Sequence, residues 1–221
     1  MNRKTRRVVA VDGGPRKNWS TAALLARALD GAADRGVETR LVRLHDLSYK
    51  GCVSCFACKT VKNWRDGRCW QRDELQPVLE LLADSTAVIM GSPIYLGDVT
   101  GAMRSFWERY LFSCMAYDWQ NLTLLERGPA VGLFYTMNVP QDAVTSMGYD
   151  ILFKTHEFIF KRLNSPAFER LTCCDTLQFD DYSRYHAPMF DEIHKKKVRA
   201  EHFPLDLQKA YEIGAKFAII D

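Results

Sequence analysis

The sequence has no apolar run long enough to cross a membrane and no large excess of charge of one sign. A spanning helix needs about 20 consecutive apolar residues, and no segment approaches that length. The net charge is only +3 in 221 residues, which does not favour nucleic acid as a partner. The basic residues 1–7 precede an apolar run of four residues, which is too short for a secretion signal. We therefore expect a cytoplasmic protein that binds neither membrane nor nucleic acid, with residues 1–7 leading into a strand.

Several residue patterns that carry chemistry are also missing. The glycine spacing fits neither the Walker A loop nor the dinucleotide fingerprint. The five histidines show no metal-ligand spacing, and no Ser-His-Asp or paired-carboxylate pattern occurs. We therefore predict no catalytic acid, base or nucleophile. Repeats and linkers are absent as well, so residues 1–221 are expected to form a single domain.

Segments with strand and helix character alternate along the chain. Strands are expected at 8–11, 37–44, 86–90, 130–135 and 168–173, and helices at 20–35, 73–82, 100–111, 143–163 and 203–220. Such alternation predicts an α/β fold whose parallel sheet is covered on both faces. We predict a flavodoxin-like three-layer αβα sandwich with a five-stranded parallel sheet in the order 2-1-3-4-5. In that arrangement FMN binds at the switch point between strands 1 and 3.

Three local expectations complete this outline. Asp73 is expected to cap the N-terminus of the helix at 73–82. Residues 174–190, rich in Asp, Tyr and Phe, are expected to be an extension used for packing or dimer contacts. His194 lies beside three consecutive lysines, Lys195 to Lys197, which predicts a solvated helix face.

The loop after the first strand has the composition of a phosphate-binding loop. Its glycines let the backbone approach a ligand closely, and the N–H groups that open the next helix add an anion site. Its side chains offer hydrogen-bond donors and positive charge. The candidate cofactor-binding residues here are Gly14, Pro15, Arg16, Lys17, Asn18, Ser20 and Thr21. An ordinary strand-to-helix turn with a Ser or Thr cap is the alternative.

The loop after the third strand is suited to lie along a flat aromatic ring. It leaves the carboxyl end of that strand, which is the expected ligand position in such sheets. Its proline and glycine favour an extended turn, and its apolar and aromatic side chains form a wall. Its backbone N–H groups are placed to bond the polar edge of an isoalloxazine. The candidate residues are Pro93, Ile94, Tyr95, Leu96 and Gly97.

Both loops resemble those of NADPH-dependent FMN reductases and iron–sulfur flavoproteins. The first is similar to Gly-Ser-Pro-Arg-x-x-Gly-Asn-Thr, although Gly14 stands where the family has serine and Trp19 where it has glycine. The second is similar to Gly-Ser-Pro-[Ile/Val]-Tyr-x-Gly-x-[Val/Thr]-[Ser/Thr]-Gly. The resemblance implies that residues 93–97 contact the flavin ring. It also implies a third flavin loop after the fourth strand, which by position is Thr136, Met137 and Asn138.

Four of the seven cysteines fall in one short stretch, at Cys52, Cys55, Cys58 and Cys69. In a cytosolic chain such spacing indicates metal or redox chemistry rather than structural disulfides. Five basic neighbours favour thiolates; these are Lys50, Lys59, Lys62, Arg65 and Arg68. The stretch resembles the compact motif of iron–sulfur flavoproteins, although the gap to Cys69 is longer. Three readings stay open: a [4Fe–4S] cluster, redox-active or vestigial thiols in a cluster-free flavoprotein, and a structural zinc site.

Taken together, these features predict a single flavodoxin-like FMN-binding domain with a Cys-rich insertion at about residues 45–72. The resemblance implies an FMN-dependent oxidoreductase that transfers electrons from NAD(P)H, a transient donor, to a quinone, a nitro or azo compound, or a flavin. One alternative is an iron–sulfur flavoprotein that exchanges electrons with a ferredoxin-type partner. The others are a non-catalytic flavin redox sensor and a zinc module that binds no flavin. The resemblance also implies a homodimer or tetramer.

Overall fold

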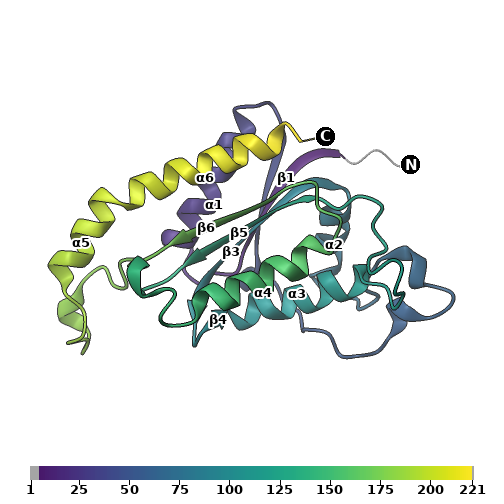
Figure 1. Ribbon diagram of the computed structural model, residues 1–221, viewed down its shortest axis with the longest axis horizontal. Helices are drawn as coiled ribbons and strands as arrows, with labels where there is room; N and C mark the ends of the chain where they lie inside the picture. Colours follow the sequence, from purple (N-terminus) through teal and green to yellow (C-terminus); the bar gives the residue numbers. More distant parts are fainter. Residues whose placement is uncertain (1–4, 221) are drawn as a thin grey trace.

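Five parallel strands form the central sheet of the computed structural model, which describes residues 5–220 (Figure 1). The first four residues of the expected lead-in lie outside the described residues. The strands lie side by side in the order β2-β1-β3-β5-β6, and every neighbouring pair on this path is parallel. They are β1 (Thr5–Asp12), β2 (Glu38–Arg43), β3 (Ser85–Tyr95), β5 (Ala130–Thr136) and β6 (Phe168–Cys173). This order confirms the predicted flavodoxin-like sheet, because β4 (Asp98–Val99) is only a short antiparallel addition to the end of β3.

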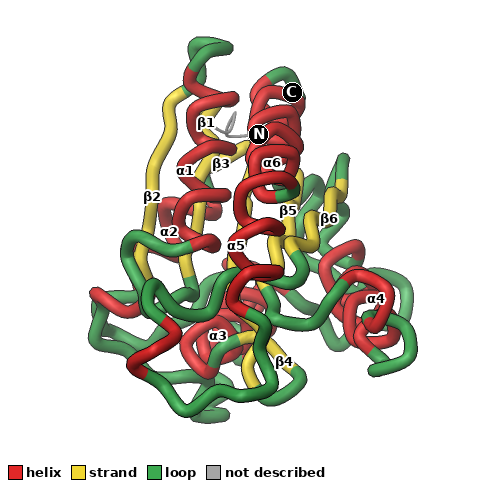
Figure 2. Tube along the Cα trace, turned by 90° about the vertical axis from the view of Figure 1, so that its left-hand side faces the viewer, coloured by secondary structure: helices red, strands yellow, loops and turns green. Residues whose placement is uncertain are grey.

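Helices cover both faces of the sheet, which makes three layers (Figures 1 and 2). One face carries α1 (Ser20–Ala33) and α6 (Phe203–Ala218), and the other carries α2 (Gln76–Ala83), α3 (Gly101–Cys114) and α4 (Tyr149–Lys161). The central strands alternate between the two cores, since Val8 and Ala10 pack under α1 and α6 while Val9 and Val11 pack toward α3. None of the described helices is long and apolar enough to cross a membrane.

Two glycines let α1 and α6 cross at very short range. A Cβ added at Gly214 of α6 would lie 1.8 Å from the carbonyl oxygen of Ala28 in α1. A Cβ added at Gly31 of α1 would lie 2.1 Å from the carbonyl oxygen of Tyr211. Only a residue without a side chain fits at either crossing point, so this helix pair depends on both glycines.

Two of the differences between expected and observed helix boundaries have a clear local cause. The helix expected at 143–163 is confined to α4, because Gly148 adopts a left-handed backbone with φ +78° just before Tyr149. Asp73 does not cap α2, which begins at Gln76. Its carboxylate instead accepts a hydrogen bond from the Leu75 N–H at 3.1 Å and pairs with Arg109.

A further helix, α5 (Glu192–Glu201), holds the lysine run that was expected to be a solvated face. That expectation is wrong for Lys195, which is 5% exposed. Short 3₁₀ turns complete the described elements, at Leu44–Asp46, Ala57–Lys59, Trp64–Asp66, Gln141–Ala143 and Tyr182–Arg184.

Candidate functional site

The three loops predicted from the sequence meet at a cleft of about 480 Å³ at the carboxyl edge of the sheet. Eleven of the predicted residues line it: Gly14, Pro15, Arg16, Thr21, Pro93, Ile94, Tyr95, Leu96, Thr136, Met137 and Asn138. The register explains the convergence, because Asp12 at the end of β1 pairs with Gly91 of β3. The cleft therefore lies where the strand order reverses, at the expected ligand position of an open α/β sheet.

Hydrogen bonds to its backbone hold the first loop against β3 and the start of α3. The Gly13 N–H donates to the Gly91 carbonyl at 2.8 Å, and the Thr100 hydroxyl donates to the Gly13 carbonyl at 2.8 Å. The buried Asp12 carboxylate accepts the Gly14 N–H at 2.8 Å. Burial raises the pKa of Asp12, although that N–H and Arg43 act in the opposite direction. These bonds fix the loop before any ligand arrives.

The start of α1 leaves backbone N–H groups available to an anion. Its N-cap residue is Trp19, which makes no side-chain cap hydrogen bond, and the first turn has no acidic residue. An uncapped helix N-terminus carries unsatisfied N–H groups and partial positive charge. The Thr21 hydroxyl lies here too, 2.8 Å from the hydroxyl of Thr136, and so links the first loop to the third.

Four predicted residues do not line the cleft. Lys17 pairs with Asp46 at 2.9 Å, and the Ser20 hydroxyl accepts from Arg199 at 3.2 Å. Asn18 is also absent from the cleft wall. Gly97 has φ +87° and completes, with Leu96 at φ +50°, the tight turn between β3 and β4. Its role is therefore to shape the second loop rather than to form the wall.

The segment 174–190 forms a wall of the cleft that the sequence did not reveal. Thr176, Gln178, Phe179 and Phe190 line it, together with Trp19 of the first loop. The Trp19 indole donates to the Leu177 carbonyl at 3.1 Å. Arg16 donates to the Gln178 carbonyl at 2.8 Å, and its guanidinium carbon lies 4.2 Å from the centre of the Trp19 ring. The first loop and the C-terminal segment thus form one continuous surface.

Lys195 links this wall to the third loop by hydrogen bonds and an ion pair. Its ammonium donates to the Asn138 carbonyl at 3.1 Å, to the Asn138 side chain, and to Asp175. His194 also lies 2.5 Å from the Asp175 carboxylate. Asp175 lies at the start of the wall segment and Lys195 in α5 shortly after its end, so their ion pair closes the segment into a loop whose base is Asn138.

Acid is expected to weaken the contacts of Asp175 with Lys195 and His194. Burial raises the pKa of Asp175, but hydrogen bonds from Lys195 and His194 outweigh burial and leave the pKa below its ordinary value. Such a carboxylate stabilises the fold above its unfolded pKa, and the contribution disappears as pH falls through the folded pKa. Between about pH 5 and pH 3, Asp175→Asn should therefore lose less free energy of unfolding than the wild type. Urea titrations across that pH range measure the difference. Asp66→Asn is the control, because Asp66 is an exposed carboxylate. Equal losses of unfolding free energy in the wild type and Asp175→Asn would contradict a stabilising role of the Asp175 ion pair.

The four cysteines lie in the long connection between β2 and α2, which we call the Cys-rich segment (residues 45–72). Cys58 is buried, Cys55 is exposed, and Cys52 and Cys69 are intermediate. Within residues 5–220, no three Cys, His, Asp or Glu side chains are grouped so that they could hold one metal ion. As arranged, this segment does not fit a [4Fe–4S] cluster or zinc, and its metal site stays a sequence prediction. Burial also raises the pKa of Cys58, although Lys59 acts in the opposite direction.

Arg109 of α3 forms hydrogen bonds to both ends of the Cys-rich segment. It is 1% exposed and donates to the Lys50 and Gln71 carbonyls, both at 3.2 Å. The same guanidinium pairs with Asp73 and donates to the Cys69 sulfur at 3.3 Å. One buried arginine therefore holds residues from before and after the first three cysteines.

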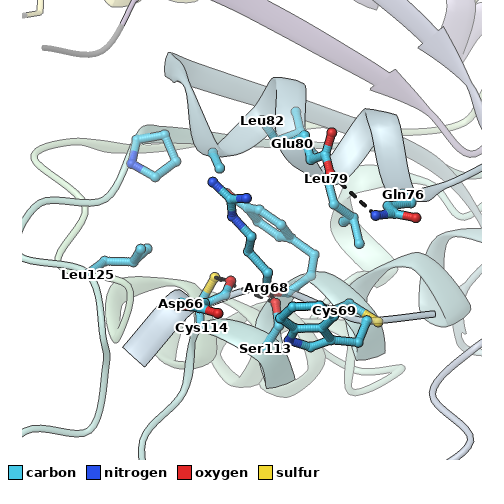
Figure 3. A pocket seen from close by; sticks show the side chains of 15 residues that line it. Asp66, Arg68, Cys69, Gln76, Leu79, Glu80, Leu82, Ser113, Cys114 and Leu125 are labelled. Carbon is cyan, nitrogen blue, oxygen red and sulfur yellow. Dashed lines mark hydrogen bonds between the residues drawn. The ribbon is translucent and has the colours of Figure 1, made fainter. Parts of the chain in front are cut away.

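A second cavity, of about 180 Å³, lies beneath this segment (Figure 3). Leu79 and Leu82 of α2, Cys69, Cys114 and Leu125 are among its lining residues. It shares no lining residue with the cleft at the carboxyl edge. Figure 1 shows the Cys-rich segment toward the opposite end of the molecule from α5. The second cavity is therefore separate from the predicted cofactor site.

Comparison with known proteins places this chain in a family. The sequence profile of the NADPH-dependent FMN reductase family matches residues 6–132. The chain belongs to this family of flavin-dependent NAD(P)H oxidoreductases. The match includes the first and second loops and the Cys-rich segment, while the third loop and the C-terminal wall lie beyond it.

Individual relatives share about half of their length with this chain. An iron–sulfur flavoprotein of Methanocaldococcus jannaschii is 29% identical over 103 residues, which cover 47% of this chain and 51% of the relative. An iron–sulfur flavoprotein of Archaeoglobus fulgidus is 31% identical over 103 residues, which cover 47% of this chain and 48% of the relative.

Solved structures resemble the chain over nearly its whole length. The NAD(P)H:quinone oxidoreductase from Methanothermobacter marburgensis superposes with a TM-score of 0.66 at 9% identity and covers 96% of both chains. An azoreductase from Bacillus anthracis gives a TM-score of 0.67 at 10% identity and covers 95% of this chain and 99% of its own. At such identities these likenesses show the fold alone.

Proposed function

We propose that the protein is an FMN-dependent oxidoreductase that transfers electrons from NAD(P)H to a small acceptor: a quinone, a nitro or azo compound, or a flavin. The observation that carries the proposal is the convergence of the three predicted loops on one cleft at the carboxyl edge of the sheet. Membership of the family supports the cofactor. The solved structures that share the fold include quinone and azo reductases, and one of the azoreductases is described in complex with FMN.

The residues present fit this cofactor on two counts. The uncapped N-terminus of α1, with no acidic residue in its first turn, suits a phosphate. The cleft volume of about 480 Å³ lies within the range of small-molecule sites. Gly14 lets the loop backbone pack closely on Asp12, since a Cβ there would lie 3.0 Å from Asp12 Oδ1.

Each loop then has a separate task. The start of α1 and Thr21 would bind the phosphate, and the turn that carries Tyr95 and Leu96 would orient the ring. Residues 136–138 would form a further wall beside the ring. Bound FMN supplies the hydride and electron transfer itself, so the side chains bind, orient and exclude water.

Reconstitution with FMN tests the proposal. Protein freed of flavin should take up FMN and then oxidise NADH or NADPH steadily with p-benzoquinone, a nitroaromatic, an azo dye or free FMN as acceptor. A protein that takes up no FMN would overturn the proposal. A protein that binds FMN but shows no steady NAD(P)H oxidation would instead be an electron carrier or a redox sensor.

Thr21→Val is expected to weaken FMN binding about tenfold, because it removes one donor and the link to Thr136. The binding constant follows from quenching of flavin fluorescence. Thr155→Val serves as the control, since the Thr155 hydroxyl bonds only to the Ile151 carbonyl within α4. Equal affinities for the two variants would show that the Thr21 hydroxyl does not contact the cofactor.

The electron-carrier alternative draws on the curated relatives, which are named iron–sulfur flavoproteins. This alternative would require the Cys-rich segment to bring its thiols together around a cluster. It would also require a ferredoxin-type partner that exchanges electrons with the protein. Iron and zinc assays on protein purified without air distinguish the readings, because a [4Fe–4S] cube requires about four irons per chain. Assembly into a dimer or tetramer stays a prediction.

A further inference from the structure

His156 of α4 is a buried histidine located between the second and third loops of the cleft. It is 2% exposed. Its Nδ1 lies 3.0 Å from the Tyr135 hydroxyl, and its Nε2 lies 3.3 Å from Asp98 Oδ1. Trp107 packs edge-on against the ring with the centroids 4.8 Å apart. Both imidazole nitrogens therefore have a polar partner, and the Trp107 ring packs against the imidazole.

The chemistry of the two partners selects one tautomer. The Asp98 carboxylate can only accept a hydrogen bond, so Nε2 must carry the proton. A neutral imidazole then has its acceptor at Nδ1, which receives the Tyr135 O–H. The neutral Nε2–H form satisfies both contacts with the Tyr135 hydroxyl as donor, whereas a charged ring would have to donate from both nitrogens.

Both partners adjoin loops that line the cleft. Asp98 follows the Leu96–Gly97 turn directly, and its Oδ1 also accepts the Val99 N–H at 2.7 Å. Tyr135 is 1% exposed and immediately precedes Thr136 of the third loop. We propose that His156 is a positioning residue that couples the second and third loops and so fixes two walls of the cleft that would hold the flavin. This inference rests on the proposed FMN site.

The charges around His156 make this coupling sensitive to acid. Burial lowers the pKa of His156, Asp98 raises it and Arg104 of α3 lowers it, with a net lowering. Glu157 of α4 and Arg170 of β6 face the neighbouring Tyr135. A proton added at low pH would occupy Nδ1, so the bond to Tyr135 could persist only with its direction reversed and the hydroxyl as acceptor.

Two variants and one control test the coupling through FMN binding. Tyr135→Phe keeps the packing and removes the hydroxyl, while His156→Phe removes both contacts. Each is expected to weaken FMN binding about tenfold, and the double variant should lose less than the two single losses combined. Phe160→Leu is the matched control, because Phe160 is a buried residue of the same helix that packs on Trp107 and makes neither of these hydrogen bonds. If Tyr135→Phe binds FMN as tightly as the wild type, the proposal is overturned, even where His156→Phe fails to fold.

A second measurement separates this proposal from the proposed function. Nitrogen chemical shifts of the His156 ring, recorded without flavin, should report the neutral Nε2–H tautomer at pH 7. An Nδ1–H or charged ring would overturn the coupling whether or not FMN binds. The expected tautomer in a protein that takes up no FMN would instead show that the proposed function has failed while the hydrogen-bonded contact stands.

Discussion

Replacing Arg109 with methionine should lower the free energy of unfolding by about 3–5 kcal/mol, as expected when one partner of a buried ion pair is removed. Asp73 would lose its partner, and the Lys50 and Gln71 carbonyls would lose their donors. The two ends of the Cys-rich segment would then separate. Urea unfolding measures the loss, and limited proteolysis should show new cleavage between residues 51 and 71.

Variants at and near the same position make the Arg109 result specific. Arg109→Lys keeps the charge without the planar fork, so its stability should fall between the wild type and Arg109→Met. Arg104→Met, at an exposed position of the same helix, should change stability by less than about 0.5 kcal/mol. If Arg109→Met unfolds at the same urea concentration as the wild type, Arg109 does not stabilise the Cys-rich segment.

Gly214→Ala should destabilise the protein by about 3 kcal/mol or more, at the upper end of overpacking costs. The new Cβ would lie 1.8 Å from the Ala28 carbonyl oxygen and 2.6 Å from its carbon, so α1 and α6 must move apart. Because α1 begins at the first loop, the same shift should also weaken FMN binding. Thermal unfolding and FMN titration of one preparation measure both effects.

The matched control is Gly101→Ala at the start of α3. An added Cβ at Gly101 meets no atom within 4 Å. Alanine there should therefore leave stability unchanged or slightly raised, since it has the better helix propensity. If the two substitutions have the same effect, the crossing of α1 and α6 does not depend on the glycine.

The alternation of strands and helices was sufficient to predict the sheet and its order. Apolar runs such as Val8 to Val11 identify buried parallel strands, and right-handed crossovers leave few topologies open. The boundary at Gly148 was missed because the periodicity of apolar residues continues through it. Its left-handed backbone is a local property that hydrophobic spacing does not report.

The candidate site was predictable where it is local and hidden where it depends on distant contacts. The loops that hold Gly14, Pro93 and Thr136 follow strands, and strand ends converge in any parallel sheet. Phe179 and Phe190 reach the cleft only because Lys195 and Arg16 fix a segment far along the chain. Three consecutive lysines indicate a solvated face, and nothing in their spacing shows that the first one is buried.

The crossing of the first and last long helices also bears on how the chain folds during synthesis. The side of α1 around Ala28 and Gly31 is covered by α6. Until α6 leaves the ribosome, that side stays uncovered and is exposed to chaperones or to other nascent chains. Contacts between segments so distant in sequence form slowly, because the entropy cost of closing the chain between them must be met first. The fold should therefore close late and cooperatively, when α6 arrives.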